Sequence, residues 1–355
     1  MEYIESYHIE KLMEYIGNSR RAAIVSHMKP DGDAMGSCIA MYHFLGQCGL
    51  TDRRIVISDN FPAYLSFMTG GMDKDSIIVH TENPAEADMA ILSSDLVICL
   101  DFNAFHRTDR LEIALTGSSA PKILIDHHLN PDKEAFSLIF SETEVSSASE
   151  LLFHILMATP PISGNAGNLP HEAATALMTG MTTDTNNFAN SVHPSTLMMA
   201  SALLGAGVDR DMILLNLYNR HSESRLRLMG HMMKDLLRIT PDGVAYMVLD
   251  AATQKEYHIE EGDTEGFVNM PLSIDKVRMS LLLKEDGDRM RVSIRSKKGT
   301  SANSCARLYF NGGGHENAAG GRLTFGKDLD SVNDAAAYIE TYTHLFFKNT
   351  DETYN

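Results

Sequence analysis

Short runs of apolar, often β-branched residues recur through the first half of the chain. They cover residues 22–27 (AAIVSH), 53–58 (RRIVIS), 96–102 (LVICLDF) and 122–128 (KILIDHH). Helix-like stretches, such as residues 35–47, lie between several of these runs. Continuous apolar strands that alternate with helices are typical of a parallel sheet covered on both faces. The pattern therefore predicts an α/β fold with a parallel sheet in the N-terminal part.

The pattern changes twice further along the chain. After about residue 146 it is mainly helical, and Ser146 or Ser147 is suited to cap the helix that follows. From about residue 243 the elements expected are a strand over 243–250, two strands around an acidic turn within 277–297, a helix over 301–310 and a glycine-rich loop over 311–321. We therefore predict a large α/β domain (1–195), a helical linker (196–238) and a smaller mixed-sheet α/β domain (239–345).

The composition narrows the class of protein. The formal net charge is -17, so the surface as a whole should repel nucleic acid, and long duplex binding is not expected. The four cysteines form no CxxC pair, which fits a reducing cytoplasm better than a disulfide framework or a zinc knuckle. The first 20 residues are charged throughout, unlike a signal peptide, and no apolar run approaches the length of a membrane span. We expect a soluble cytoplasmic protein without a membrane partner.

Carboxylates and imidazoles gather where the predicted strands end. The candidates are His27, Asp31, Asp33, Asp101, Asp126, His127, His128 and, later in the chain, Asp184. Ligand-binding residues of open parallel sheets lie outside the carboxyl ends of the strands, so these side chains can meet at one edge. Oxygen and nitrogen donors without a thiolate suit Mn²⁺ or Mg²⁺. Two such ions, about 3.5–4 Å apart, can clamp a phosphoryl group and make hydroxide from water at neutral pH.

Each cluster also has a purely structural interpretation. Asp31 and Asp33 follow Pro30 and can serve a turn or a helix cap, and Asp101 can cap a turn. A single aspartate such as Asp184 is more often structural than catalytic. Independent structural roles for all the clusters together are improbable, so the joint pattern favours a metal site.

These residues resemble a known family. HMKPDGDAMGS (27–37), the strand-end Asp101, the DHH triplet (126–128) and Asp184 resemble, in this order, the four motifs of the DHH phosphoesterase superfamily. GGGHENAAGG (312–321) resembles the signature of the type 1 DHH-associated domain, so the resemblance covers roughly residues 20–325. It implies an enzyme with a di-manganese centre in the cleft between two domains.

The resemblance also implies roles for individual residues. His27 and Asp31 would bind one ion, and Asp33, His127 and Asp184 the other, with Asp101 as the bridge; His128 would support the ligands or contact phosphate, and Asp126 would orient it. The substrate-binding candidates are Arg107, Arg295, Gly312, Gly313, Gly314 and His315. Glycines let backbone N–H groups approach an anion, and alternation along a strand would place Arg291, Arg295 and Lys297 on one face. An exposed helix cation at Arg107, a flexible loop at 311–321 and a solvated edge at Lys297 and Lys298 are the structural alternatives.

The absence of a long basic groove with aromatic platforms favours a short substrate. Within the superfamily the chain is similar to the nano-RNase type, which implies a Mn²⁺-dependent phosphoesterase acting on oligonucleotides of a few residues, pApA or 3′-phosphoadenosine 5′-phosphate. Alternatives are a cyclic-di-AMP phosphodiesterase, a single-strand exonuclease, which would normally be larger, and a pyrophosphatase, which would lack the GGGH segment. A non-catalytic nucleotide-binding regulator would be expected to lose a ligand such as Asp101 or Asp184. Mg²⁺ as the ion and a homodimer are left open.

Overall fold

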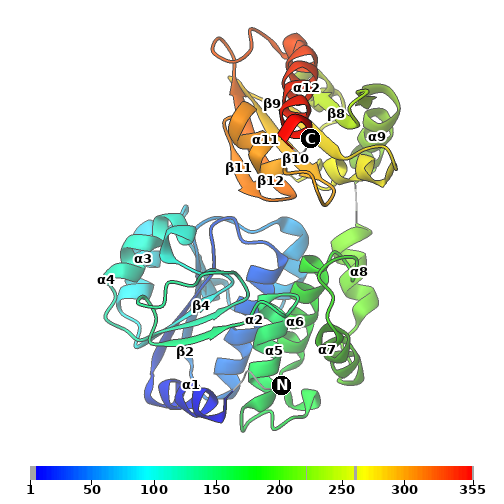
Figure 1. Cartoon of the computed structure of the whole chain (residues 1–355). Coiled ribbons are helices and arrows are strands. Elements are labelled where there is room, and N and C mark those ends of the chain that lie inside the picture. Colours follow the sequence, from blue (N-terminus) through cyan, green and yellow to red (C-terminus); the bar gives the residue numbers. More distant parts are fainter. Residues whose placement is uncertain (1–4, 221, 260–261, 354–355) are drawn as a thin grey trace. The chain divides into compact units, whose positions relative to one another are not determined.

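The computed structural model describes residues 5–220, 222–259 and 262–353, except for the side chains of His315 and residues 350–353. The chain forms two compact units, Met1–Arg220 (unit 1) and His221–Asn355 (unit 2) (Figure 1). The division falls inside the segment that the sequence analysis assigned to a helical linker. The domain limits proposed there stay a prediction, and each unit is described below by itself.

Unit 1 is built on a six-stranded parallel sheet with the strand order β3-β2-β1-β4-β5-β6. The strands are β1 (Arg21–Val25), β2 (Asp52–Ile57), β3 (Ile77–Val79), β4 (Leu96–Leu100), β5 (Lys122–Asp126) and β6 (Leu138–Ser141). The helices are α1 (Ser6–Asn18), α2 (Gly32–Gln47), α3 (Pro84–Leu92), α4 (Glu112–Gly117), α5 (Ala148–Ala158), α6 (His171–Asp184), α7 (Pro194–Gly205) and α8 (Arg210–Tyr218). The direction of strand succession reverses between β1 and β4, which is where sheets of this order hold their ligands.

Helices cover both faces of this sheet. Along β1, Ile24 belongs to a core shared with α1, α2, α5 and α6, whereas Ala23 and Val25 belong to a second core shared with α3 and α4. Figure 1 shows α3 and α4 on the opposite side of the strands from α2, α5 and α6. The alternation of side chains along a strand requires apolar residues at successive positions when both faces are buried. The predicted parallel α/β fold is thereby confirmed.

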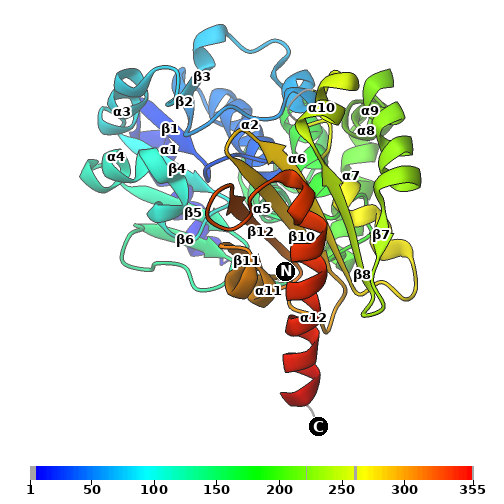
Figure 2. The same cartoon turned by 90° about the horizontal axis from the view of Figure 1, so that it is seen from above.

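Unit 2 contains a mixed six-stranded sheet with the order β11-β12-β10-β9-β8-β7, in which only β8 and β9 pair in parallel. The strands are β7 (Arg238–Ile239), β8 (Val244–Leu249), β9 (Met279–Asp286), β10 (Arg289–Ser296), β11 (Gly313–His315) and β12 (Ala318–Thr324). The helices are α9 (Glu223–His231), α10 (Ala251–Glu256), α11 (Ala302–Tyr309) and the C-terminal α12 (Ala335–Thr353), drawn in red in Figure 2. Helices α11 and α12 pack on one face of the sheet and α9 on the other. The smaller mixed-sheet α/β part was predicted correctly.

The glycine-rich segment after α11 differs from the prediction. Instead of a loop, it forms the β11–β12 hairpin, in which Gly313 pairs with Gly320. A Cβ atom on Gly312 would lie 1.9 Å from the carbonyl oxygen of Gly320, and one on Gly314 would lie 2.6 Å from that of Ala318. These glycines therefore allow two backbones to pack closely, a role that looks like loop flexibility in the sequence.

Two further observations complete the fold. Strand β10 ends at Ser296, so Lys297 lies beyond the strand face on which it was expected, and its Nζ donates to the carbonyl oxygen of Ile274 at 2.9 Å. Within the described part of the chain, every helix is too short or too polar to cross a membrane.

Candidate metal centre

The strand order brings the predicted ligands to one edge of the unit 1 sheet. His27 and Asp31 follow β1, Asp101 directly follows β4, and His127 directly follows β5. Because β1, β4 and β5 are adjacent and parallel, their carboxyl ends meet at this edge. Asp184 arrives from elsewhere, as the last residue of α6.

The side chains form three sets of donor atoms, each set lying within 4.8 Å. The sets are His27, Asp31 and Asp101; Asp33, His127 and Asp184; and Asp101, His127 and His128. The Nε2 atom of His27 lies 3.4 Å from Asp101 Oδ2, and that of His127 lies 3.6 Å from Asp101 Oδ1. Each set could hold a metal ion, and Asp101 is shared by two of them.

Asp101 has the features of a side chain that needs a cation. Its side chain is buried, and its Oδ1 atom has no hydrogen-bond partner among the described residues. Its backbone φ of 63° lies in the left-handed region, which non-glycine residues seldom occupy. Such strain persists only where the surroundings enforce it, and it clusters at functional sites. A buried carboxylate oxygen without a donor, facing two imidazole nitrogens, fits a bound divalent ion.

Asp33 is held by backbone groups from another helix. Its carboxylate oxygens accept hydrogen bonds from the N–H groups of Ala148, at 2.7 Å, and Ser149, at 2.9 Å. Both amides belong to the first turn of α5, where the helix dipole favours a negative charge. The predicted N-cap of this helix is confirmed as Ser147, whose Oγ accepts from the N–H of Glu150. The α5 N-terminus thus fixes the position of Asp33.

Asp31 has the capping role considered from the sequence, and this role leaves room for the other. It is the N-cap of α2, because its Oδ1 atom accepts from the N–H groups of Asp33 and Ala34. Capping engages one oxygen only, and the side chain is 60 % exposed. A helix cap and a metal ligand are therefore compatible at this position.

Three glycines let α2 and α6 approach each other closely. A Cβ atom on Gly36 would lie 2.6 Å from the carbonyl oxygen of Ala176, and one on Gly32 would overlap the Thr183 side chain. A Cβ atom on Gly180 would lie 2.0 Å from Ser149 Oγ and 2.9 Å from Asp33 Oδ1. The sequence analysis missed these positions, although the four-residue spacing of Gly32 and Gly36 is a signal for close helix packing.

The electrostatics of the cluster favour proton or cation uptake. Burial, together with the neighbouring carboxylates, raises the pKa of Asp101 well above its ordinary value. The same causes raise the pKa of Asp184 to about 9, and burial raises that of Asp33 as well. Burial lowers the pKa of His127, which favours the neutral ring that binds a metal. Bound divalent cations would offset the repulsion between these carboxylates.

His128 is oriented by a buried carboxylate. Its Nδ1 atom lies 2.7 Å from Asp126 Oδ1, and Asp126 has no exposed surface. Because a carboxylate oxygen accepts, this contact places a proton on His128 Nδ1, and it fixes the orientation of the ring. Arg107 is half-buried after β4; its charge counteracts the rise in the pKa of Asp101, and its carbonyl oxygen accepts from the N–H of Met28.

The predicted substrate residues of unit 2 lie on β10 and the β11–β12 hairpin. Arg295 is half-buried, burial lowers its pKa, and its Nη1 atom donates to the carbonyl oxygen of Ile294 at 2.9 Å. The N–H of Gly314 donates to Asn303 Oδ1 at 3.0 Å, so this amide is already engaged within the protein. The His315 side chain lies outside the described residues. The predicted placement of the site between two domains stays a prediction.

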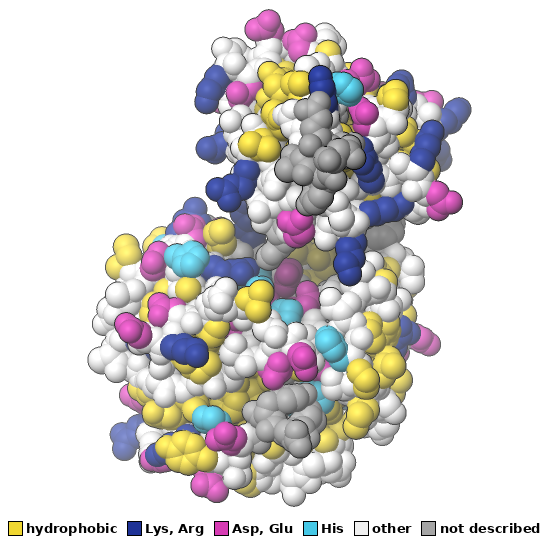
Figure 3. Space-filling model, viewed as in Figure 1, with side chains coloured by type: hydrophobic (Ala, Val, Ile, Leu, Met, Phe, Trp, Pro, Cys, Tyr) yellow, Lys and Arg dark blue, Asp and Glu magenta, His cyan; other side chains and the backbone are white. Residues whose placement is uncertain are grey.

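A row of basic residues crosses the same sheet. Arg291 on β10 has Lys284 on β9 and Arg322 on β12 as its direct cross-strand neighbours. These three residues are called the basic row. Like charges directly opposite each other on neighbouring strands repel. Lys and Arg side chains are also prominent on the face of unit 2 shown in Figure 3.

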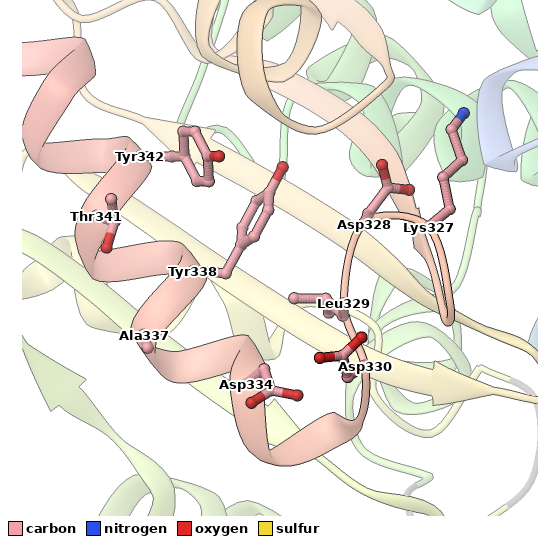
Figure 4. A pocket seen from close by; sticks show the side chains of 9 residues that line it. All are labelled: Lys327, Asp328, Leu329, Asp330, Asp334, Ala337, Tyr338, Thr341 and Tyr342. Atoms are coloured by element: carbon pink, nitrogen blue, oxygen red, sulfur yellow. The ribbon is translucent and has the colours of Figure 1, made fainter.

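A hollow of about 330 Å³ in unit 2 is separate from all these residues (Figure 4). It lies between α12 and the turn that follows β12, and Tyr338, Tyr342, Asp328 and Asp330 are among the residues that line it. None of the residues predicted for the site contributes to its lining.

Comparison with known proteins identifies the class. Residues 21–181 match the model of the DHH family, N-terminal domain, and residues 242–342 match the DHHA1 domain. A Streptococcus mutans relative, named probable bifunctional oligoribonuclease and PAP phosphatase NrnA, is 30 % identical over 83 % of this chain and 86 % of its own. The chain therefore belongs to the DHH family, and it is a hydrolase that acts on phosphoester bonds, as the sequence analysis predicted.

Two solved structures share the fold. An exopolyphosphatase-related protein from Bacteroides fragilis is 35 % identical, with a TM-score of 0.86 over 97 % of this chain and 99 % of its own. The exonuclease RecJ, solved bound to manganese, is 16 % identical, with a TM-score of 0.55 over 95 % of this chain and 93 % of its own.

Proposed function

We propose that the protein is a Mn²⁺-dependent phosphoesterase that hydrolyses very short oligonucleotides, pApA and 3′-phosphoadenosine 5′-phosphate. The observation that carries the proposal is the buried, hydrogen-bond-deficient Asp101, which forms one donor set with His27 and Asp31 and lies 3.6 Å from His127, a member of another set. Binding two cations at one shared carboxylate suits displacement at phosphorus. We expect the enzyme to act in the cytoplasm, where the four free cysteines stay reduced.

In this proposal, His27, Asp31 and Asp101 would hold one ion, and Asp33, His127 and Asp184 would hold the other. Asp101 would serve both ions, because its Oδ1 atom lies 3.6 Å from His127 Nε2. The ions would supply the acidity that makes water nucleophilic at neutral pH and the positive charge that stabilises the transition state. The absence of a thiolate from the donor sets supports a hard ion, and the manganese bound to RecJ supports Mn²⁺, with Mg²⁺ as the alternative.

The remaining candidates contact the substrate. Asp126 keeps the His128 ring in one orientation and the proton on Nδ1, so that Nε2 can interact with a phosphate oxygen. Arg107 counteracts the negative charge at Asp101 and can pair with the same phosphate.

Unit 2 would bind the rest of the substrate. Arg295 and the glycine hairpin would contact one nucleotide, and the basic row would contact the phosphate of a second. The name of the Streptococcus mutans relative supports oligoribonucleotides and 3′-phosphoadenosine 5′-phosphate as substrates.

A substrate panel tests the proposal. Purified protein with Mn²⁺ is incubated with pApA, a five-nucleotide RNA, 3′-phosphoadenosine 5′-phosphate, cyclic di-AMP, pyrophosphate, inorganic polyphosphate and long single-stranded DNA. The expected result is turnover of the first three alone. Asp101→Asn should lower kcat by at least about 10²-fold, because it removes the shared ligand. Asp88→Asn, which alters an exposed carboxylate that contacts His80, should leave kcat unchanged.

Each contrary outcome assigns the protein differently. Rapid cleavage of pyrophosphate, polyphosphate or long DNA would contradict the proposed substrate class. Full activity of Asp101→Asn would contradict the proposed metal centre. Binding of nucleotides without turnover, in protein that has bound Mn²⁺, would indicate a nucleotide-binding regulator instead.

A further inference from the structure

A second buried carboxylate, Glu150, lies in α5 outside the donor sets. Its side chain has no exposed surface. The Oε2 atom accepts hydrogen bonds from the Ser146 N–H at 2.9 Å, from the Ser146 hydroxyl, and from the Thr196 hydroxyl at 2.7 Å. The other oxygen, Oε1, lies 3.5 Å from His154 Nε2. A buried carboxylate with this many donors on one atom fixes the segments from which the donors come.

One of these segments leads to Asp33. Ser146 immediately precedes the N-cap of α5. The amides of Ala148 and Ser149, which hold the Asp33 carboxylate, follow Ser146 by two and three residues. By accepting both the N–H and the hydroxyl of Ser146, Glu150 determines how the chain enters the helix. The position of these two amides, and with them Asp33, depends on that entry.

The other segment leads back to Asp184. Thr196 lies in the first turn of α7, and its hydroxyl oxygen also accepts from the N–H of His193 at 3.0 Å. Residues 185–193 connect Asp184 to this turn, and four of them have positive φ values, namely Asn186, Asn187, Phe188 and Ser191. A strained connection holds its shape only when both of its ends are fixed. The bond from Thr196 to Glu150 fixes the end remote from Asp184.

The network is held by the ionised form of Glu150. Burial alone would raise its pKa, but the contact with His154 and the hydrogen bonds from Ser146, Ser195 and Thr196 outweigh burial and lower the pKa to about 2. The carboxylate is therefore charged throughout the range in which the enzyme would work.

We propose that Glu150 is a positioning residue for the ion held by Asp33, His127 and Asp184. It joins the backbone that holds Asp33 to the far end of the segment that follows Asp184, without contacting the ion. This inference rests on the proposed function, because it takes that donor set as a metal site. A buried carboxylate with only a structural role would change stability and leave the two ions equally bound; a positioning role weakens one ion selectively.

Direct titration of the metal-free protein with Mn²⁺ tests the inference. The loss of the electron paramagnetic resonance signal of free Mn²⁺ reports binding independently of activity. In Glu150→Gln the side chain keeps its size and its amide oxygen can still accept from Ser146 and Thr196, but the negative charge that strengthens these hydrogen bonds is lost. We expect one of the two Mn²⁺ dissociation constants to rise about tenfold, the lower limit for residues that orient a ligand from outside, and the other to stay unchanged. The Mn²⁺ concentration for half-maximal activity should rise in parallel, with kcat recovered at saturating Mn²⁺.

Three further variants separate positioning from folding. Thr196→Val removes only the bond on the α7 side and should weaken the same ion by a smaller factor, whereas Thr196→Ser keeps the hydroxyl and should restore wild-type binding. Tyr42→Phe removes a different buried hydrogen bond of unit 1, the one to Ser76 Oγ at 2.7 Å, and should lower stability without changing either constant. If Glu150→Gln fails to fold, the two Thr196 variants decide the question.

The outcomes distinguish the two proposals. Two unchanged constants in folded Glu150→Gln or Thr196→Val, or an equal rise in both, would overturn the positioning role while the di-metal centre stands. A wild-type protein that binds fewer than two Mn²⁺ ions would overturn the proposed function and this inference together.

Discussion

At the scale of single residues, the centre is defined by charges that the protein alone does not neutralise. Asp101 is buried with one oxygen lacking a donor, and Asp33 and Asp184 lie beside it. Burial and repulsion from neighbouring carboxylates, Asp31 among them, raise the pKa of each of the three. A structural role alone would favour fewer carboxylates or more donors. The arrangement is instead suited to bind cations, because the protein holds the carboxylates close together.

This electrostatic arrangement predicts a pH dependence for the metal-free protein. The pKa of Asp184 rises from an ordinary value of 3.8 to about 9 on folding, so the folded chain binds this proton more tightly than the unfolded chain. The contribution of this group to stability is then largest at low pH and is lost as the pH rises from about 4 to about 9. With a chelator present, we expect the Tm to decrease between about pH 5 and pH 8, measured by calorimetry.

Two comparisons isolate the cause of that slope. Asp184→Asn removes the titrating group and should flatten the pH dependence of the Tm. Saturating Mn²⁺ should reverse it in the wild type, because ligands bind the ion only when deprotonated. A Tm of the metal-free wild type that increases over this range, or an unchanged slope in Asp184→Asn, would contradict the assignment.

At the scale of elements, close helix packing delivers the ligands that are not at strand ends. Helices α2 and α6 carry Asp33 and Asp184, and α5 supplies the amides that hold Asp33. Gly36 and Gly180 permit the approach, because a Cβ atom on either would collide with the facing backbone or side chain. The geometry of the second donor set is therefore set by helix packing.

Gly180→Ala tests this packing. The added methyl would meet Ser149 Oγ at 2.0 Å and Asp33 Oδ1 at 2.9 Å, so the helices must separate. Overpacking of this kind costs about 1–3 kcal/mol, which urea denaturation would measure, and Mn²⁺ binding should weaken as well. Gly17→Ala is the matched control: nothing lies within 4 Å of its added Cβ in α1, and alanine there should raise stability by up to about 1 kcal/mol. Equal stability of the two variants would contradict the close-packing role.

The helices and strands also show how much of the fold can be predicted from the sequence. The apolar runs correctly predicted β1, β2, β4 and β5, because fully buried strands leave a continuous hydrophobic signal. They missed the three-residue β3 and the four-residue β6, which are too short to show a pattern. The candidate ligands were recognisable because chemistry restricts their residue types. Glu150, Ser149 and Gly180 were not, because their importance depends on which segments lie against them, and a single sequence does not specify such contacts.

At the scale of the whole molecule, the candidate metal ligands and the candidate substrate residues lie in two different units, which have separate hydrophobic cores. All the candidate metal ligands lie in unit 1, whereas Arg295, the glycine hairpin and the basic row lie in unit 2. Among the residues that the structure describes, both hydrophobic cores of unit 1 are formed by unit 1 alone. This division predicts that metal binding raises the free energy of unfolding of unit 1 and leaves that of unit 2 unchanged.

Calorimetric unfolding of the intact chain should therefore show two transitions, of which Mn²⁺ shifts only one. At a concentration 100 times its dissociation constant, one bound ion adds about 2.7 kcal/mol to the free energy of unfolding. For a unit of this size, that corresponds to a rise in Tm of about 5–10 °C. Asp101→Asn should abolish the shift and leave the other transition unchanged, because every donor set found among the described residues lies in unit 1. An equal shift of both transitions, or a single cooperative transition, would mean that the units unfold together and that the metal site stabilises the whole chain.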